Sequence, residues 1–106
     1  MIWVKVKTRE DRICSLEITG HAEFAEHGKD IVCAGVSSIG TGLLNAIDIM
    51  CPEDCILKKE DNLIYIEVLH DSERLQDILH TGYIQLDTVR EVFSRYVRIR
   101  KTEVRK

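Results

Sequence analysis

The sequence is poor in the residues and patterns that mark linkers, repeats and membrane spans. It has one proline, one tryptophan, three tyrosines and two phenylalanines among 106 residues. Without a low-complexity segment or an internal repeat, a proline-rich linker and a repeat architecture are excluded. No apolar run approaches the roughly 20 residues of a membrane-spanning helix, and the N-terminus lacks the layout of a signal peptide. We therefore expect a soluble cytoplasmic protein with no membrane partner.

The four cysteines are too few for a disulfide scaffold in a reducing compartment. They are expected to be ordinary thiols, metal ligands or a nucleophile. Cys51 and Cys55 lie close together, but a structural zinc site needs four ligands and the sequence shows no second cluster beside them. We therefore predict two ordinary thiols at these positions, no metal and no other cofactor.

Charge is unevenly distributed along a chain whose formal net charge is −3. Residues 95–106 carry six basic side chains and one acid, a charge of +5, which leaves −8 for the preceding 94 residues. An acidic body disfavours nonspecific wrapping of nucleic acid and suits a basic peptide partner, so no direct DNA binding is expected. The basic tail is expected to be a solvated terminus, with contact to RNA as the alternative. The aromatic residues are too scattered in the sequence to predict a base-stacking platform.

Hydrophobic periodicity predicts a β-hairpin followed by a helix in the first half of the chain. Apolar and polar residues alternate over 2–7 and again over 14–19, which is typical of strands, and the polar segment 8–12 forms a turn between them. From Ile31 the period becomes helical and continues to Pro52. The predicted buried stripe of this helix consists of Val32, Val36, Ile39, Leu43, Ala46 or Ile47, and Met50.

The second half of the chain repeats the order strand, strand, helix. Residues 55–59 and 63–69 predict a second hairpin, and the second of these strands is apolar on both faces, so we expect it to be central and covered on both sides. Asp71 or Ser72 is expected to cap the second helix. Residues 97–101 predict a short last strand. The predicted buried face of the second helix consists of Leu75, Ile78, Leu79, Gly82, Leu86, Val89, Phe93 and Tyr96.

These elements predict an α/β sandwich of order ββαββα, with or without a final strand. It would be a small single domain over residues 1–106, with a mixed β-sheet and two long helices. Three glycines, Gly35, Gly40 and Gly42, lie inside the first helix, where each costs roughly 1 kcal/mol relative to alanine. We expect close packing against the sheet or a partner helix to compensate.

The segment with the most chemical information joins Gly20-His21-Ala22 to Asp30-Ile31-Val32-Cys33. With Asp30 as the N-cap, Cys33 would be the third residue of the helix, where unpaired N–H groups and the helix dipole favour the reactive thiolate. His21 lies at the start of a connection that must return to the helix, so an imidazole–thiol pair is geometrically possible. In such a pair His21 would accept the thiol proton and later donate it to a leaving amine.

A structural interpretation of both residues remains open at this point. Cysteine is among the most buried residue types, and Cys33 on the first turn of a buried helix is compatible with a place in the core. Size alone favours a binding module, because a chain this small has little material for the walls of a deep cleft. The sequence carries no glycine-rich phosphate loop and no serine nucleophile elbow.

The same segment resembles the ribosomal-processing cysteine protease family known as Prp. The family pattern is a Gly-His-Ala, an aromatic and glycine-containing loop, and then Asp-Ile-Val-Cys-Ala-Ala-Val-Ser. It is matched by His21-Ala22, by Gly28-Lys29-Asp30-Ile31-Val32-Cys33-Ala34, and by Val36-Ser37. The resemblance extends to the order of strands and helices and covers essentially the whole chain. It implies a small bacterial cytoplasmic homodimer that removes a short N-terminal extension from the ribosomal large-subunit protein numbered twenty-seven.

The resemblance also assigns roles to individual residues. Cys33 matches the nucleophile and His21 the general base, while Asp30 matches a position that orients the site, a role that helix capping would explain equally well. The loop expected to cover the substrate contains Gly20, Ala22, Phe24 and Gly28. The departures from the family pattern, none at the His/Cys pair, are Glu23, His27 and Gly35.

Two functional hypotheses follow from the sequence. The preferred one is a cysteine endopeptidase that acts on the N-terminal region of this ribosomal protein through a Cys33/His21 dyad and is needed for ribosome maturation. The alternative is a non-catalytic, ribosome-associated binding module, in which Cys33 is structural and the basic C-terminal tail contacts RNA. The mass of the products from the extended ribosomal protein distinguishes the two.

Overall fold

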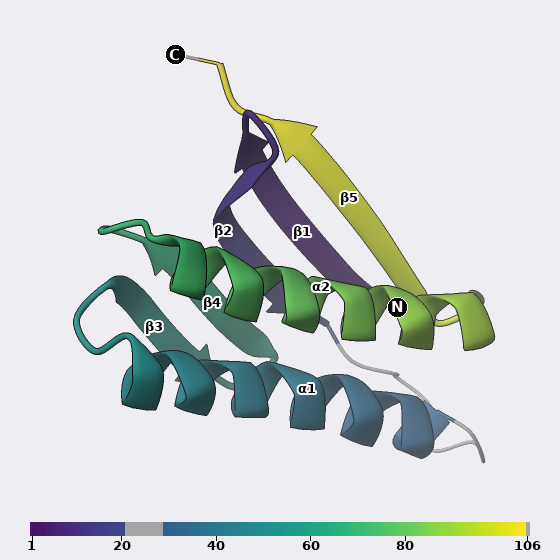
Figure 1. The fold of residues 1–106 in the computed structure, drawn as a ribbon. Coiled ribbons are helices and arrows are strands. Elements are labelled where there is room, and N and C mark those ends of the chain that lie inside the picture. Colours follow the sequence, from purple (N-terminus) through teal and green to yellow (C-terminus); the bar gives the residue numbers. More distant parts are fainter. Residues whose placement is uncertain (21–28, 106) are drawn as a thin grey trace.

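The elements follow the expected order, with a seventh element at the end of the chain (Figure 1). The structure is a computed structural model that describes residues 1–20 and 29–105, with Lys29 and Asp30 described by their backbone alone. The helices are α1 (Lys29–Met50) and α2 (Glu73–Val92). The strands are β1 (Ile2–Arg9), β2 (Arg12–Thr19), β3 (Cys55–Glu60), β4 (Leu63–Val68) and β5 (Val97–Glu103).

The five strands form one mixed sheet in the order β3-β4-β2-β1-β5. Neighbouring strands are antiparallel except β1 and β5, which are parallel because α2 crosses the sheet between β4 and β5. Both helices lie side by side on one face of the sheet (Figure 1), and no described element covers the other face, which we call the open face. The predicted α/β sandwich with a mixed sheet and two long helices is confirmed.

The first hairpin carries the expected alternation up to an irregularity near its turn. Ile2, Val4 and Val6 are buried against the helices. A register shift between Lys7 and Thr8 interrupts the pairing of β1 with β2. The strand β2 therefore buries Ile13, and Cys14, which was predicted to share a face with Leu16 and Ile18, is only half-buried.

Strand β4 does not have the surroundings that its composition predicted. Ile64 and Ile66 are buried beneath the helices, whereas Leu63 and Tyr65 are half-buried on the open face. The prediction that β4 is covered on both sides was wrong because α1 and α2 lie on the same face of the sheet (Figure 1). An apolar composition on both faces of a strand does not determine how many layers cover it.

Helix α1 packs on the sheet through a narrow stripe whose members are Val32, Val36, Gly40, Leu43 and Ile47. A Cβ on Gly40 would lie 2.6 Å from Ile64 Cδ1, so the predicted close approach to the sheet is confirmed there. The stripe ends differently from the prediction, since Met50 is 48% exposed and Cys51 is buried in its place.

The length of this apolar helix also corrects an expectation. The stretch Ile31–Met50 is 20 residues long and apolar enough to cross a membrane by length and composition, contrary to the expectation that no run approaches this length. In this fold one side of the stretch contributes to the core, which is the arrangement of a core helix.

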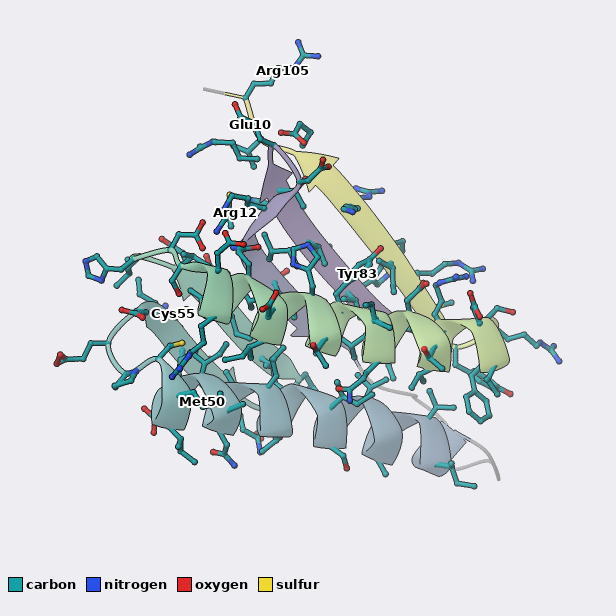
Figure 2. The ribbon with its side chains drawn as sticks, viewed as in Figure 1. Glu10, Arg12, Met50, Cys55, Tyr83 and Arg105 are labelled. Carbon is teal, nitrogen blue, oxygen red and sulfur yellow. The ribbon has the colours of Figure 1, made fainter. Side chains whose placement is uncertain are left out.

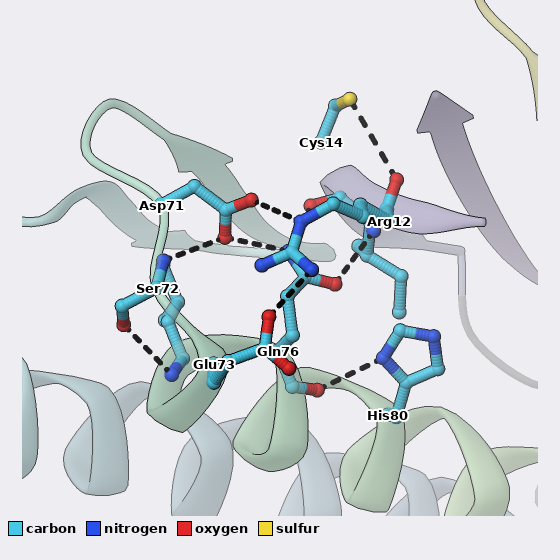
Figure 3. Close-up of polar contacts among 9 residues, drawn as sticks. Arg12, Cys14, Asp71, Ser72, Glu73, Gln76 and His80 are labelled. Atoms are coloured by element: carbon cyan, nitrogen blue, oxygen red, sulfur yellow. Dashed lines mark hydrogen bonds and ion pairs between the residues drawn. The ribbon is translucent and has the colours of Figure 1, made fainter. Parts of the chain in front are cut away.

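The N-terminus of α2 is tied to the first hairpin by a polar network (Figure 3). Ser72, one of the two predicted caps, is the N-cap of α2. Its hydroxyl accepts a hydrogen bond from the Leu75 N–H at 3.1 Å. Asp71 instead accepts from Arg12 Nε at 2.6 Å and from the Ser72 N–H at 2.8 Å. These bonds hold the pKa of Asp71 below its ordinary value, with the Arg12 hydrogen bond as the largest cause.

Gln76 completes this network from the first turn of α2 (Figure 3). Its side-chain oxygen accepts from the Ile13 N–H at 2.8 Å, and its amide nitrogen donates to the Ile13 carbonyl at 2.9 Å. A buried side-chain amide thus replaces a strand partner beside the irregular end of β2. The predicted face of α2 is confirmed at Leu75, Leu79, Gly82 and Leu86, which are buried. Its other members are half-buried, and two of them, Phe93 and Tyr96, lie beyond the end of the helix at Val92.

The basic C-terminal segment forms the predicted last strand, which extends to Glu103, and its charged side chains are exposed to solvent as expected. Strand β5 pairs with β1 along its whole length, and the Val104 N–H donates to the Thr8 carbonyl at 2.6 Å. Glu103 accepts from the N–H of Glu10 in the turn after β1 at 2.9 Å. Arg105 extends past this end of the sheet (Figure 2).

Candidate active site

Cys33 lies near the N-terminus of α1, two residues further into the helix than its sequence position suggested. The helix begins at Lys29, so Asp30 is the second helical residue and not the N-cap, and Cys33 is the fifth. The prediction of Asp30 as the cap was wrong because the helix extends toward the preceding loop. The Cα–Cβ bond of a helical residue tilts toward the N-terminus, so the Cβ of Cys33 leans toward the first turn, whose N–H groups have no partner within the helix.

The Cys33 side chain is half-buried and lines a pocket of about 250 Å³. Val36 and Ser37 extend the helical wall, and the apolar floor comes from Ile2 and Ile18 of the first hairpin. A polar rim completes the pocket, made by Lys59, Glu60, Asp61 and Asn62 at the turn between β3 and β4. A nucleophile beside an apolar floor and a polar rim can act on a bound peptide segment.

Gly20 lines the same pocket and could not be replaced there by a larger residue. Its φ is +86°, and a Cβ would overlap with the carbonyl oxygen of Met1. Its N–H donates to the Asn62 carbonyl at 3.3 Å, which fixes it against the polar rim. Gly20 is the residue that directly precedes His21 in the sequence.

The remaining predicted site residues lie outside the described residues. They are His21, Ala22, Phe24 and Gly28, together with the side chain of Asp30. The structure therefore brings together Cys33 and Gly20 from the predicted set. The pairing of His21 with Cys33 and the role of Asp30 remain predictions.

The polar rim is the part of the pocket that the sequence analysis missed. Its residues were interpreted only as the turn of a hairpin. The pairing of β2 with β4 places Thr19 opposite Leu63, so this turn lies beside the end of β2 from which the chain leads toward His21. The signal needed was the strand order, which hydrophobic alternation in single strands does not contain.

Cys51 and Cys55 have surroundings that differ from those of Cys33. Cys51 is buried, and burial together with the charge of Asp54 raises the pKa of the Cys55 thiol to about 11. Cys55 lies near the far end of α1 from Cys33 (Figure 2). Within residues 1–20 and 31–105, no three histidine, cysteine or acidic side chains are grouped so that they could hold a metal ion.

Comparison with known proteins identifies the family. The family described as "Cysteine protease Prp" matches residues 1–98. This chain belongs to the Prp family. The "Ribosomal processing cysteine protease Prp" of Bacillus subtilis (strain 168) is 29% identical over an alignment of 107 positions that covers 93% of this chain and 96% of that protein. The protein of the same name in Staphylococcus aureus (strain NCTC 8325 / PS 47) is 29% identical over an alignment of 103 positions that covers 93% of this chain and 97% of that protein.

Solved structures of a Prp relative have the same fold. The crystal structure of Prp from S. aureus in complex with a substrate peptide gives a TM-score of 0.87 at 27% identity, over 96% of this chain and all of that chain. A second S. aureus structure, with a covalently linked product peptide, gives a TM-score of 0.86 at 28% identity over the same shares of the two chains. The family and these neighbours show that this chain is a cysteine peptidase. The alternative of a non-catalytic binding module with a structural Cys33 is therefore set aside.

Proposed function

We propose that this Prp-family peptidase removes a short N-terminal extension from the ribosomal large-subunit protein numbered twenty-seven, in the cytoplasm, by means of a Cys33/His21 dyad. The observation that carries the proposal is the pocket that Cys33 shares with Gly20, the residue before His21. Both candidate groups therefore belong to chain segments that meet at one pocket. The covalently linked product peptide in the S. aureus relative is the kind of species that a nucleophilic thiol forms.

The chemistry follows from the place of Cys33 at the helix N-terminus. His21 accepts the thiol proton, and the Cys33 sulfur attacks the carbonyl carbon of the scissile peptide bond. N–H groups of the first helical turn, which have no partner within the helix, can stabilise the oxyanion that forms. His21 then donates its proton to the departing amine, and water hydrolyses the remaining thioester. Asp30 would act as an orienting residue of the dyad.

The polar rim suggests what part of the substrate lies beside Cys33. Glu60 and Asp61 place two exposed carboxylates at the pocket, next to an apolar floor. A pocket of about 250 Å³ holds one or two side chains, so most of a peptide substrate must lie along the surface outside it. We infer that an apolar substrate residue occupies the floor and that basic residues nearby interact with the rim.

The test of this function uses the extended form of that ribosomal protein from the same organism. Incubation with the purified peptidase is expected to yield two products, a short N-terminal peptide and the mature protein, whose masses locate the bond. Cys33→Ala and His21→Ala are each expected to abolish cleavage without changing the circular dichroism spectrum. Full cleavage by the Cys33→Ala protein would contradict the proposal. If Cys33→Ala abolished cleavage and His21→Ala did not, the thiol mechanism would stand and the role of His21 would be contradicted.

We also infer that the chain forms a homodimer through the outer side of α1. Ile31 and Ile49 are 66% and 77% exposed there. At Gly35 and Gly42 an added Cβ would meet no atom within 4 Å, so the monomer does not use the space that these glycines leave. A partner helix would use it. Light scattering after gel filtration is expected to give twice the chain mass, and Gly42→Leu is expected to shift the protein toward monomer; a wild-type monomer at high concentration would contradict the inference.

A further inference from the structure

The open face of the sheet carries a group of cations along its two last strands. Ile2, Val4, Val6 and Val97 point into the core, so the intervening side chains of β1 and β5 lie on the open face. The residues of this group, which we call the basic strip, are Trp3, Lys5, Lys7, Arg98 and Arg100. Its four cations are exposed and its tryptophan is half-buried.

The register of the parallel pair brings these cations together. Lys5 lies opposite Arg100, and Trp3 lies opposite Arg98. The Arg100 guanidinium lies over the Trp3 ring at 5.7 Å from its centroid. Like charges at directly opposite positions of neighbouring strands destabilise a sheet. Their presence here is a local conflict of the kind that marks functional surfaces.

No acidic side chain forms an ion pair with the strip within the described part of the chain. The open-face positions of β1 and β5 include no aspartate or glutamate, and none of the four cations forms an ion pair with a described residue. Glu17 of β2, opposite Lys5, is the nearest acid in the register. A local cationic surface therefore exists on a chain whose net charge is −3.

The chemistry of the strip fits RNA better than other anionic partners. An acidic protein segment would satisfy the cations but would make no use of the planar Trp3–Arg100 pair, on which bases stack. A membrane surface would require exposed apolar anchors, and the exposed large apolar residues of the described chain lie outside β1 and β5. We propose that the basic strip binds single-stranded RNA, through phosphate contacts to the cations and base stacking at Trp3 and Arg100.

This surface is separate from the peptidase pocket, because Cys33 lies on the helix that covers the opposite face of the sheet. Substrate cleavage and RNA binding are therefore expected to be independent in the purified protein. The proposal goes beyond the proteolytic function and does not depend on the identity of the protein substrate.

The chain offers an intrinsic probe for the test, because Trp3 is its one tryptophan. Titration of the full-length protein with unlabelled oligouridylate at low salt is expected to quench its tryptophan fluorescence. Anisotropy of a fluorescein-labelled oligouridylate gives the affinity. The logarithm of the binding constant is expected to fall with the logarithm of the salt concentration, with a slope that loses about 0.7 for each cation removed from the strip.

A matched pair of double variants assigns the binding to one face. Lys5→Gln with Arg100→Gln removes two charges from the strip and is expected to weaken binding about tenfold or more at low salt. Arg74→Gln with Lys101→Gln removes two charges elsewhere. Arg74 lies on α2, and Lys101 lies over the Tyr83 ring of α2 at 5.3 Å from its centroid, on the other face of β5. This control is expected to keep the wild-type affinity within about twofold.

The outcomes separate RNA from the competing partners. Quenching of Trp3 together with selective loss in the strip variant supports the proposal, and both variants should cleave the ribosomal substrate at the wild-type rate. Absence of oligouridylate binding at low salt would overturn it, as would equal weakening by the strip and control variants. Tighter binding to polyglutamate or to anionic lipid vesicles than to oligouridylate would also overturn it, in favour of an acidic protein or a membrane.

Discussion

At the scale of single residues, the cysteines are distinguished by their surroundings in the fold. Cys33 lines the pocket at the start of α1, whereas Cys51 is buried in the core. Cys55 lies against β4 with a pKa of about 11, because its thiolate would be partly desolvated and close to Asp54. A thiol in these surroundings is protonated at neutral pH, so exposure alone does not predict which cysteine reacts.

Iodoacetamide is expected to alkylate Cys33 before Cys55. At a pH of about 8, roughly one Cys55 thiol in a thousand would be ionised, given its pKa of about 11. Peptide mass spectrometry should therefore find modification at Cys33 accompanied by loss of cleavage, with Cys55 reacting only as the pH rises toward 11. Cys55→Ser serves as the control and should cleave at the wild-type rate. Modification of Cys55 as fast as Cys33 at neutral pH would contradict the expectation.

Gly20 gives a second prediction at this scale. Gly20→Ala forces a side chain into a left-handed conformation and against the Met1 carbonyl, so the chain must shift where it leads to His21. We expect kcat/KM for the ribosomal substrate to fall at least about tenfold, equivalent to roughly 1.4 kcal/mol. Thr88→Ala, at an exposed position of α2, should retain activity. Equal activity in the two variants would show that the start of this loop tolerates displacement.

At the scale of elements, the placement of α2 depends on polar contacts as well as on its apolar face. The side chain of Gln76 bonds both the N–H and the carbonyl of Ile13, where the register of the first hairpin is irregular. Arg12 extends the contact to Asp71 and Glu73 at the start of the helix. The Arg12 pairs are solvent-exposed and contribute little, whereas the Gln76 bonds are buried.

Gln76→Leu is therefore expected to destabilise the fold strongly for a single substitution. It would leave two backbone groups of Ile13 buried without partners, each at a cost of about 1–3 kcal/mol. The measurement is the free energy of unfolding from urea titration. Gln85→Leu on the exposed side of α2 is the matched control and should change it by less than about 0.5 kcal/mol. A loss with Gln76→Leu no larger than with the control would show that water replaces the amide.

At the scale of the whole molecule, two acids of the polar rim and the cations of the basic strip lie on different surfaces. The polar rim places Glu60 and Asp61 beside Cys33, while the basic strip occupies the other face of the sheet. The rim places two of the 18 acidic residues of the chain next to the nucleophile. A basic substrate would be attracted to this end of the molecule.

Cleavage of a basic substrate is accordingly expected to depend on ionic strength. Raising the salt concentration from about 0.05 to 0.5 M should lower kcat/KM several-fold, because exposed charges are screened. Glu60→Gln with Asp61→Asn should lower the rate at low salt and remove most of this dependence. Asp48→Asn with Glu91→Gln, which neutralises two exposed acids on the helices, is the control. A salt-independent rate in the wild type would contradict a role for the rim.

The helices and strands could be predicted well from the sequence, whereas the order of the strands and the layers that cover them could not. Alternation in β1 and the helical period from Ile31 reflect contacts within a few residues, so they are readable without the fold. The open face of β4 and the polar rim beside Cys33 depend on strand order, which is set by contacts between distant segments. The predicted N-cap at Asp30 failed for a smaller reason, since the helix begins at Lys29, two residues earlier than its cap signal indicated.

The parallel pairing of the first and last strands has a consequence for how the chain is made. Partners in this pair, such as Thr8 and Glu103, are 95 residues apart. During synthesis the edge of β1 stays unpaired until β5 has left the ribosome, so the sheet is completed only after its other four strands have been made. Until then this edge is open to pairing with other chains, and the lysines that face outward from β1 would discourage such contacts.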